Sequence, residues 1–223
     1  MKSRGNTDLA LLIHQAAIDP HLSLKELDQL CEASKHFNFS GFCTNLKRLP
    51  EARKRLNKSS RTKLIGLIAF PFGFTTSSQK HSEAEWAADE GADELEAVPD
   101  FLALSDNKPD QFAEELAKIC EIGLPVRVIL DTSQMNPDKI DIAIDIAIDA
   151  GVSGIQAGNG FGNGVSADDI YQISKKSRER CEIKAVGGIK TLDQVIKLNQ
   201  AGADRIGTSL GIEIMEELRA RKN

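Results

Sequence analysis

The chain has 223 residues, of which 41% are hydrophobic, 27% charged and 5% aromatic. This balance fits one sizeable globular domain spanning residues 1–223. The formal net charge of -5 provides no basic surface for nucleic acid or for an anionic membrane. This net charge is still compatible with a local positive pocket for an anionic ligand, because net charge describes only the whole molecule.

Four cysteines are spread along the chain without a C-x-x-C pair, which argues against a zinc knuckle and against a disulfide framework. The first residues, "MKSRGNTDLALLIH", contain too short an apolar run for a secretory signal. The sequence has no stretch of 18 apolar residues. We therefore expect a cytoplasmic protein with reduced thiols and no contact with membranes.

Short apolar runs alternate with amphipathic segments along the chain. The runs predict strands at 9–14, 40–45, 63–70, 93–98, 125–131, 152–158, 181–187 and 203–209. The segments between and after them predict helices near 24–36, 47–57, 79–91, 109–123, 137–150, 166–178, 191–201 and 210–221. Eight strand–helix units in one chain of domain length predict an α/β fold, a single (β/α)8 TIM barrel.

The segment 137–150, "PDKIDIAIDIAIDA", alternates like a strand but carries helix signals. Asn136 is a suitable N-cap and Pro137 suits the first helical position. Aspartates recur at every fourth position, at Asp141, Asp145 and Asp149. We interpret them as one solvated stripe on a helix; a metal site is the alternative, but it needs ligands that converge.

Strand alternation places a polar set on the inner faces of the predicted barrel. Residues at the carboxyl ends of barrel strands form the active site in this architecture. We therefore expect these side chains to meet at one mouth. They are Cys43, Asn45, Glu94, Glu96, Arg127, Asp131, Gly154, Gln156, Glu182 and Lys184.

Lys184 is the candidate reactive residue of this set. A lysine in a low-dielectric mouth can lose its proton and act as a nucleophilic amine or as an acid and base. The alternative is a purely structural core network in which Lys184 pairs with Glu96 or Asp131.

Glycines and hydroxyls follow the last two predicted strands. "AVGGIKT" and "IGTSLG" place backbone N–H groups and hydroxyls where they could hold a phosphate near a helix N-terminus. Ordinary glycine turns are the alternative. The candidate phosphate-binding residues are Gly187, Gly188, Gly207, Thr208 and Ser209.

Several blocks resemble, in order, the deoxyribose-phosphate aldolase family from about residue 13 to the end. They are "GFCTNLKRLPEARKRL", "FPFGFTTSSQKHSEAEWAADEGADELEAV", "VRVILDTSQM", "GVSGIQAGNGFGNGVSADDI" and "IKAVGGIKTLDQVIKLNQAGADRIGTS". The resemblance implies a single (β/α)8 barrel. It also implies cleavage of 2-deoxyribose 5-phosphate to glyceraldehyde 3-phosphate and acetaldehyde, through a Schiff base on a strand 6 lysine and without a metal or other cofactor.

The family's residues carry over unevenly. Its second active-site lysine falls on Lys184, and its phosphate loops fall on the glycines and hydroxyls named above. Its Schiff-base lysine falls on Gln156, its strand 4 aspartate on Glu96, and its early "DHT" run on "IHQ", with Ile13 in place of a site carboxylate. A glutamine amide is not nucleophilic, so covalent catalysis at position 156 is excluded, although Gln156 can hydrogen-bond a carbonyl or hydroxyl.

Two hypotheses follow. One is an aldolase acting on a small phosphorylated aldehyde or sugar, with Lys184 and Glu96 as partners and Asp131 nearby. The other is a phosphosugar-binding or regulatory protein without turnover. A dinucleotide site at Gly162, Gly164 and Ala167 is a weak third reading, since the next strand ends in glycines.

Metal-dependent chemistry is disfavoured by the scattered histidines, which we expect to be ordinary helix or loop residues without a carboxylate cluster. They are His14, His21, His36 and His81. The sequence leaves the oligomeric state open, with a homodimer as one outcome.

Overall fold

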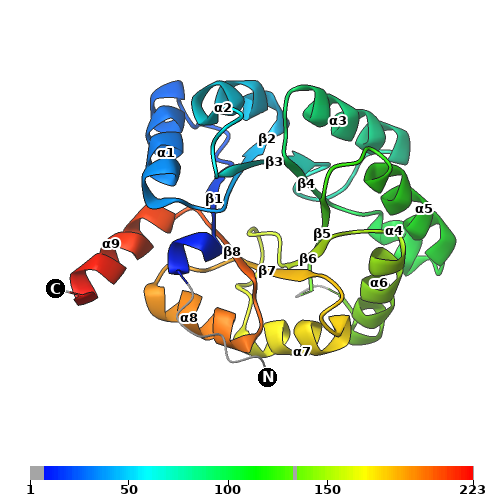
Figure 1. The fold of residues 1–223 in the computed structure, drawn as a ribbon. Coiled ribbons are helices and arrows are strands. Elements are labelled where there is room, and N and C mark those ends of the chain that lie inside the picture. The colour runs from blue at the N-terminus through cyan, green and yellow to red at the C-terminus, as the bar shows by residue number, and fades with distance from the viewer. Residues whose placement is uncertain (1–7, 133–134, 223) are drawn as a thin grey trace.

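The structure is a computed structural model that describes residues 8–132 and 135–222. Eight parallel strands close into a barrel in sequence order, with helices around it (Figure 1). The single (β/α)8 barrel predicted from the alternating pattern is confirmed. The strands are β1 Ile13–Ala17, β2 Gly41–Asn45, β3 Lys63–Ile68, β4 Glu94–Ala97, β5 Val126–Leu130, β6 Gly154–Ala157, β7 Glu182–Val186 and β8 Arg205–Thr208.

The helices begin at the polar caps that the sequence supplies. Four of them begin with a capping box. The Ser or Thr side chain at the N-cap accepts a hydrogen bond from the backbone N–H of the third helical residue, and the side chain of that third residue accepts one from the N-cap backbone N–H. The α-helices are α1 Leu24–Phe37, α2 Leu49–Leu56, α3 Ser77–Asp89, α4 Phe101–Ser105, α5 Pro109–Cys120, α6 Pro137–Asp149, α7 Ala167–Ser177, α8 Leu192–Ala201 and α9 Gly211–Lys222. Two 3-10 helices, η1 Leu9–Leu12 and η2 Leu46–Arg48, complete the chain order.

The first predicted strand is misplaced. Residues 9–12 form η1, and β1 starts only at Ile13, where it pairs with β2 and β8. The side chain of Asp8 accepts a hydrogen bond from Ala10 N at 3.2 Å, which caps the 3-10 turn. Ala10 and Leu12 are buried whereas Leu11 is exposed, so the apolar run marked a segment that is buried on one side but did not predict its backbone conformation.

Two other features concern helices. Segment 137–150 is helical as predicted, and its three aspartates are exposed. Asp141 pairs with Lys176 of α7, and Asp145 pairs with Arg180, which follows α7. The short helix α4 was not predicted. It forms where Asp100 accepts from the backbone N–H groups of residues 102 and 103, both at 3.0 Å.

The outer faces of the strands build the hydrophobic core between barrel and helices. The side chains predicted to face outward are fully or almost fully buried in one cluster, as expected: Leu95, Ala97, Val128, Ile155, Ile183 and Ala185. Within residues 8–132 and 135–222, no helix is both long and apolar enough to cross a bilayer. The inner faces are thereby left for polar residues.

Gly158, directly after β6, provides a stability test. Its φ is +81°, and a Cβ there would lie 2.3 Å from the carbonyl oxygen of Val186. Gly158→Ala should lower the free energy of unfolding by about 2–5 kcal/mol, because left-handed strain and overpacking add. Gly123→Ala is the matched control: its φ is +89° but nothing lies within 4 Å, so a loss of only about 1–2 kcal/mol is expected. Equal losses in urea unfolding would contradict the packing argument.

Candidate active site

A lysine and a glutamate meet inside the barrel. Lys184 Nζ on β7 donates to Glu96 Oε1 on β4 at 2.6 Å and lies 3.3 Å from Cys43 Sγ on β2. Lys184 is 2% exposed and Glu96 1%. The predicted convergence of these side chains is therefore observed, and the pair is removed from bulk water. The pairing of Lys184 with Glu96 that a structural network requires is also present.

Arg127 on β5 extends this pair into a network. It donates to Glu96 Oε1 at 3.1 Å and to Glu182 Oε2 at 2.9 Å, and Arg205 donates to Glu182 at 2.8 Å. Burial by itself would raise the pKa of Glu96. The charges of Lys184 and Arg127 outweigh burial and hold the pKa of Glu96 well below its usual range. Glu96 is thus an ionised carboxylate balanced by two cations.

His14 lies on the inner face of β1, so its assignment as an ordinary helix or loop residue is wrong. The predicted strand 9–14 already included residue 14, and its pairing with Gly41 and Gly207 confirms that it lies within β1. Its Nδ1 lies 3.9 Å from Glu96 Oε1, too far for a hydrogen bond, and has no hydrogen-bond partner among the described residues. Burial, against the opposing pull of Glu96, lowers the pKa of His14 to about 3. The imidazole is therefore neutral near pH 7.

The expectation that no histidine–carboxylate cluster forms is also wrong. Ligand atoms of His14, Cys43 and Glu96 lie within 4.8 Å of one another. However, burial raises the pKa of the Cys43 thiol to about 12, and a metal ligand must be a thiolate. The Lys184 nitrogen already lies within 3.3 Å of both Glu96 and Cys43. This cluster therefore surrounds a lysine ammonium.

Gln156 on β6 is adjacent to Lys184 in the strand register. It is 2% exposed, its Nε2 donates to the carbonyl of Gly158 at 3.0 Å, and its Oε1 has no partner among the described residues. A buried amide oxygen without a partner is costly. It is available to accept a hydrogen bond from a ligand hydroxyl or from water.

Asp131 and Asn45 lie farther out than the lysine pair. Asp131 follows β5 and accepts from Asn159 Nδ2 at 3.0 Å, in the wall of a pocket described below. Asn45 ends β2, where its side chain accepts from Arg48 N at 3.2 Å and caps η2. The structure thus brings Glu96, Cys43, Gln156 and Lys184 together and places these two at the strand ends.

The glycines and hydroxyls after β7 and β8 have unequal roles. A Cβ on Gly207 would lie 2.8 Å from Lys184 Cε, so this glycine makes room for the lysine. The Thr208 hydroxyl donates to the carbonyl of Ile189 at 2.8 Å. Ser209 is exposed two residues before α9, while Gly187 and Gly188 have positive φ and lie beside the loop after β6. Ser209 and the two loop glycines are the accessible part of the predicted phosphate site.

Comparison with known proteins identifies the family. No family model matches the chain. The deoxyribose-phosphate aldolase of Microcystis aeruginosa is 36% identical over 217 residues, which cover 97% of this chain and 96% of the relative. That of Trichormus variabilis is 36% identical over 213 residues, covering 95% and 94%. The chain belongs to the deoxyribose-phosphate aldolase family.

Solved structures agree with this membership. The aldolase QR15 superposes with a TM-score of 0.91 at 34% identity, covering 96% of this chain and 97% of its own. The deoxyribose-phosphate aldolase of Aeropyrum pernix, described as tetrameric, has a TM-score of 0.84 at 22% identity, covering 96% and 92%, and supports the fold alone. A homodimer remains a prediction for this family member.

One residue in the family-like "IHQ" run lies away from the site. Ile13, aligned with a site carboxylate of deoxyribose-phosphate aldolases, is fully buried in the outer hydrophobic core. A Cβ on Gly211, at the start of α9, would lie 3.0 Å from Ile13 Cγ2. The β1 side chain beside the lysine pair is His14, which was left out of the predicted inner set although the predicted strand 9–14 contains it.

The buried His14 makes a testable contribution to acid sensitivity. Its pKa in the folded protein, about 3, lies below the ordinary 6.5, so the unfolded chain binds the proton first and stability falls as pH drops below about 6.5. The contribution is about 1.4 kcal/mol per pH unit. From pH 6.5 to 5, wild type should therefore lose about 2 kcal/mol more than His14→Gln in urea unfolding. His21→Gln, at an exposed position, is the control; parallel pH profiles for wild type and His14→Gln would refute the assignment.

Proposed function

We propose that this protein binds a small sugar phosphate at the carboxyl end of the barrel and that its reaction is reversible aldol cleavage of 2-deoxyribose 5-phosphate. The products are glyceraldehyde 3-phosphate and acetaldehyde. The observation that carries the proposal is Lys184, a buried amine 2.6 Å from the Glu96 carboxylate in a member of this family. Its relatives are named for this substrate.

The loops after β7 and β8 support a phosphate site. Gly187 and Gly188 expose backbone without side chains, and Ser209 precedes the N-terminus of α9. Helix N-termini favour anions because their first N–H groups are unpaired and the helix dipole is positive there. A phosphate bound here would place the carbon chain of a sugar toward the barrel interior, where Lys184 lies.

The chemistry must proceed without a lysine at position 156. In a Schiff-base mechanism the amine condenses with the sugar carbonyl and releases water. A base then takes the proton of the hydroxyl at C3 as the C2–C3 bond breaks, and the bond electrons pass to the iminium nitrogen. This releases glyceraldehyde 3-phosphate and leaves an enamine. Protonation of the enamine at C2 and hydrolysis by water then release acetaldehyde and return the free amine. Gln156 cannot form that iminium. Lys184 is the amine available on the adjacent strand, but Glu96 stabilises its ammonium form, so we expect the condensation step to be slow.

A binding or regulatory protein without turnover is the second candidate. Gln156 favours it, because an amide with an unpaired buried oxygen can hold a ligand hydroxyl yet cannot react. The Lys184–Glu96 pair would then serve folding and ligand orientation. Covalent trapping separates the two candidates.

Ligand binding is the first test of the proposal. Millimolar 2-deoxyribose 5-phosphate or inorganic phosphate should raise the melting temperature, because a ligand selective for the folded state stabilises it by about 2.7 kcal/mol at 100 times its Kd. Ser209→Asp should abolish the shift through charge repulsion at the phosphate. Ser59→Asp, which adds the same charge in the exposed turn between α2 and β3, should keep it. If wild type shows no shift, both candidate functions fail.

Restoring a lysine is the second test. Gln156→Lys should place an amine beside Lys184, and two adjacent amines lower each other's pKa. Borohydride with acetaldehyde or 2-deoxyribose 5-phosphate should then trap an adduct at residue 156, located by peptide mass, whereas wild type should give little or none. Turnover should be only partly restored, because Glu96 is one methylene longer than aspartate and small misplacements can cost about a hundredfold.

Two outcomes would change this interpretation. A strong wild-type adduct at Lys184, absent in Lys184→Met, would show that the chemistry has moved to β7 and that Gln156 is not disabling. A folded Gln156→Lys protein that binds phosphosugar but traps nothing would favour the binding protein.

A further inference from the structure

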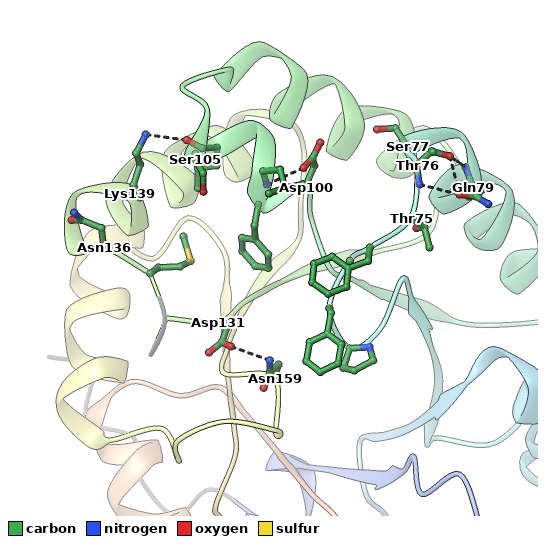
Figure 2. A pocket seen from close by; sticks show the side chains of 18 residues that line it. Thr75, Thr76, Ser77, Gln79, Asp100, Ser105, Asp131, Asn136, Lys139 and Asn159 are labelled. Carbon is green, nitrogen blue, oxygen red and sulfur yellow. Dashed lines mark hydrogen bonds between the residues drawn. The ribbon is translucent and has the colours of Figure 1, made fainter.

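A cavity of about 840 Å³ opens among the segments that follow β3, β4 and β5, with Asp131 and Asn159 in its wall (Figure 2). Its walls come from the loop between β3 and α3, from α4, and from the start of α6. Asp131 and Asn159 lie at one end and Thr75 to Gln79 at another. This volume is within the range of small-molecule sites.

Most of the lining surface is apolar. Phe72, Phe74 and Leu102 line the cavity although they are 53%, 84% and 69% exposed. Phe72 stacks on Phe74 with ring centroids 5.8 Å apart, and Phe161 from the loop after β6 lies 6.4 Å from Phe72. Several large apolar side chains exposed together on a soluble protein indicate a binding surface.

The charged groups of the cavity are two carboxylates and one lysine, beside hydroxyl and amide side chains that can both donate and accept. Asp131 accepts from Asn159 at 3.0 Å, and Asp100 also faces the cavity while capping α4. Lys139 is the lining cation, but its Nζ is engaged by the carbonyl of Leu104 at 2.9 Å and by Asn107 Oδ1 at 2.6 Å. Two carboxylates with one engaged lysine disfavour an anion and favour a head group that donates hydrogen bonds.

The cavity differs in position and chemistry from the phosphate loops. Its walls follow β3, β4 and β5, whereas the phosphate loops follow β7 and β8, on the other side of the closed barrel (Figure 1). Only a short stretch of backbone joins the lysine site to the cavity. Gln156 donates a hydrogen bond to the carbonyl of Gly158, and the next residue, Asn159, donates one to Asp131 in the cavity wall. The cavity therefore borders the lysine site without sharing its phosphate end.

We infer that this cavity is a second binding site, for a small molecule with an aromatic or branched apolar body and a hydrogen-bond-donating head, best an ammonium. The apolar body packs on Phe72, Phe74 and Leu102. The head group lies on Asp131. This site is independent of the aldol chemistry and is not a site for a phosphate.

Three probes with one apolar body test the head group: 2-phenylethylamine, 2-phenylethanol and phenylacetate. Binding is measured by calorimetry and by chemical-shift changes, with the phosphate loops saturated by inorganic phosphate. The amine should bind about tenfold more tightly than the alcohol, a difference of about 1.4 kcal/mol, and phenylacetate should not bind measurably. Tightest binding of phenylacetate, or no binding of any probe, would overturn the inference.

Variants locate the site and separate its two parts. Phe74→Ala and Leu102→Ala should each weaken amine and alcohol alike, by about fivefold to tenfold, because both lose apolar contact. Asp131→Asn should remove the preference for the amine while the alcohol still binds. Tyr171→Ala, on α7 and 54% exposed, is the matched control and should change nothing. Equal weakening by the control, or loss of probe binding on adding phosphate, would place the probes elsewhere.

The outcomes for the two sites are separable. A phosphosugar shift without probe binding contradicts this inference and leaves the proposed function intact. Probe binding without a phosphosugar shift contradicts the proposed function and leaves the cavity assignment intact.

Discussion

The contact between Lys184 and Glu96 is the constraint on which the interior of this barrel depends. Both groups are charged and almost fully buried, so each would be strongly unfavourable alone; removing one partner of such a pair typically costs about 3–5 kcal/mol. Neighbouring strands are adapted to it. Arg127 supplies a second cation, Cys43 packs against the lysine nitrogen, and Gly207 has no side chain where the lysine passes. The strand geometry and the polar interior therefore stabilise each other.

The same contact limits the chemistry. A nucleophilic amine must be neutral, whereas a carboxylate at 2.6 Å stabilises the ammonium. A second lysine on the adjacent strand would oppose that effect by like-charge repulsion, but position 156 holds a neutral amide. Strong folding interactions and weak nucleophilicity thus have one origin here. Family membership makes aldol cleavage the reaction to test, and the charges around Lys184 bear on how readily an amine there could react.

The fold was predictable because burial alternates with the periods of strand and helix. Period-two alternation assigned Glu96, Arg127, Gln156 and Lys184 to one face correctly, and Asn136 with Pro137 located the start of α6. The pattern failed at residues 9–14, where an apolar run is equally compatible with a buried 3-10 turn. His14 was missed for another reason: it lies at the end of the predicted strand 9–14, but it was treated as an ordinary helix or loop histidine and its face was not assigned.

The cavity was beyond sequence reasoning for a different reason. Phe72 and Phe74 come from the loop between β3 and α3, and Leu102 comes from the five-residue helix α4. Segments this short or irregular carry no periodicity from which a shared surface could be predicted. Their exposure becomes informative only when the loops are seen together with Asp131 and Asn159.

The barrel mouth therefore has two unlike halves around a central charged pair. The loops after β7 and β8 present glycine backbone and a helix N-terminus, which suit an anion, whereas the loops after β3, β4 and β5 present aromatic rings and carboxylates, which suit an apolar body with a donor head. Because the two halves differ in charge preference, no single small ionic ligand is favoured by both. Lys184 and Glu96 lie between the two halves, so a molecule that approaches from either half meets the same buried pair. The differences in lining between the halves, rather than this pair, are therefore what can distinguish one compound from another.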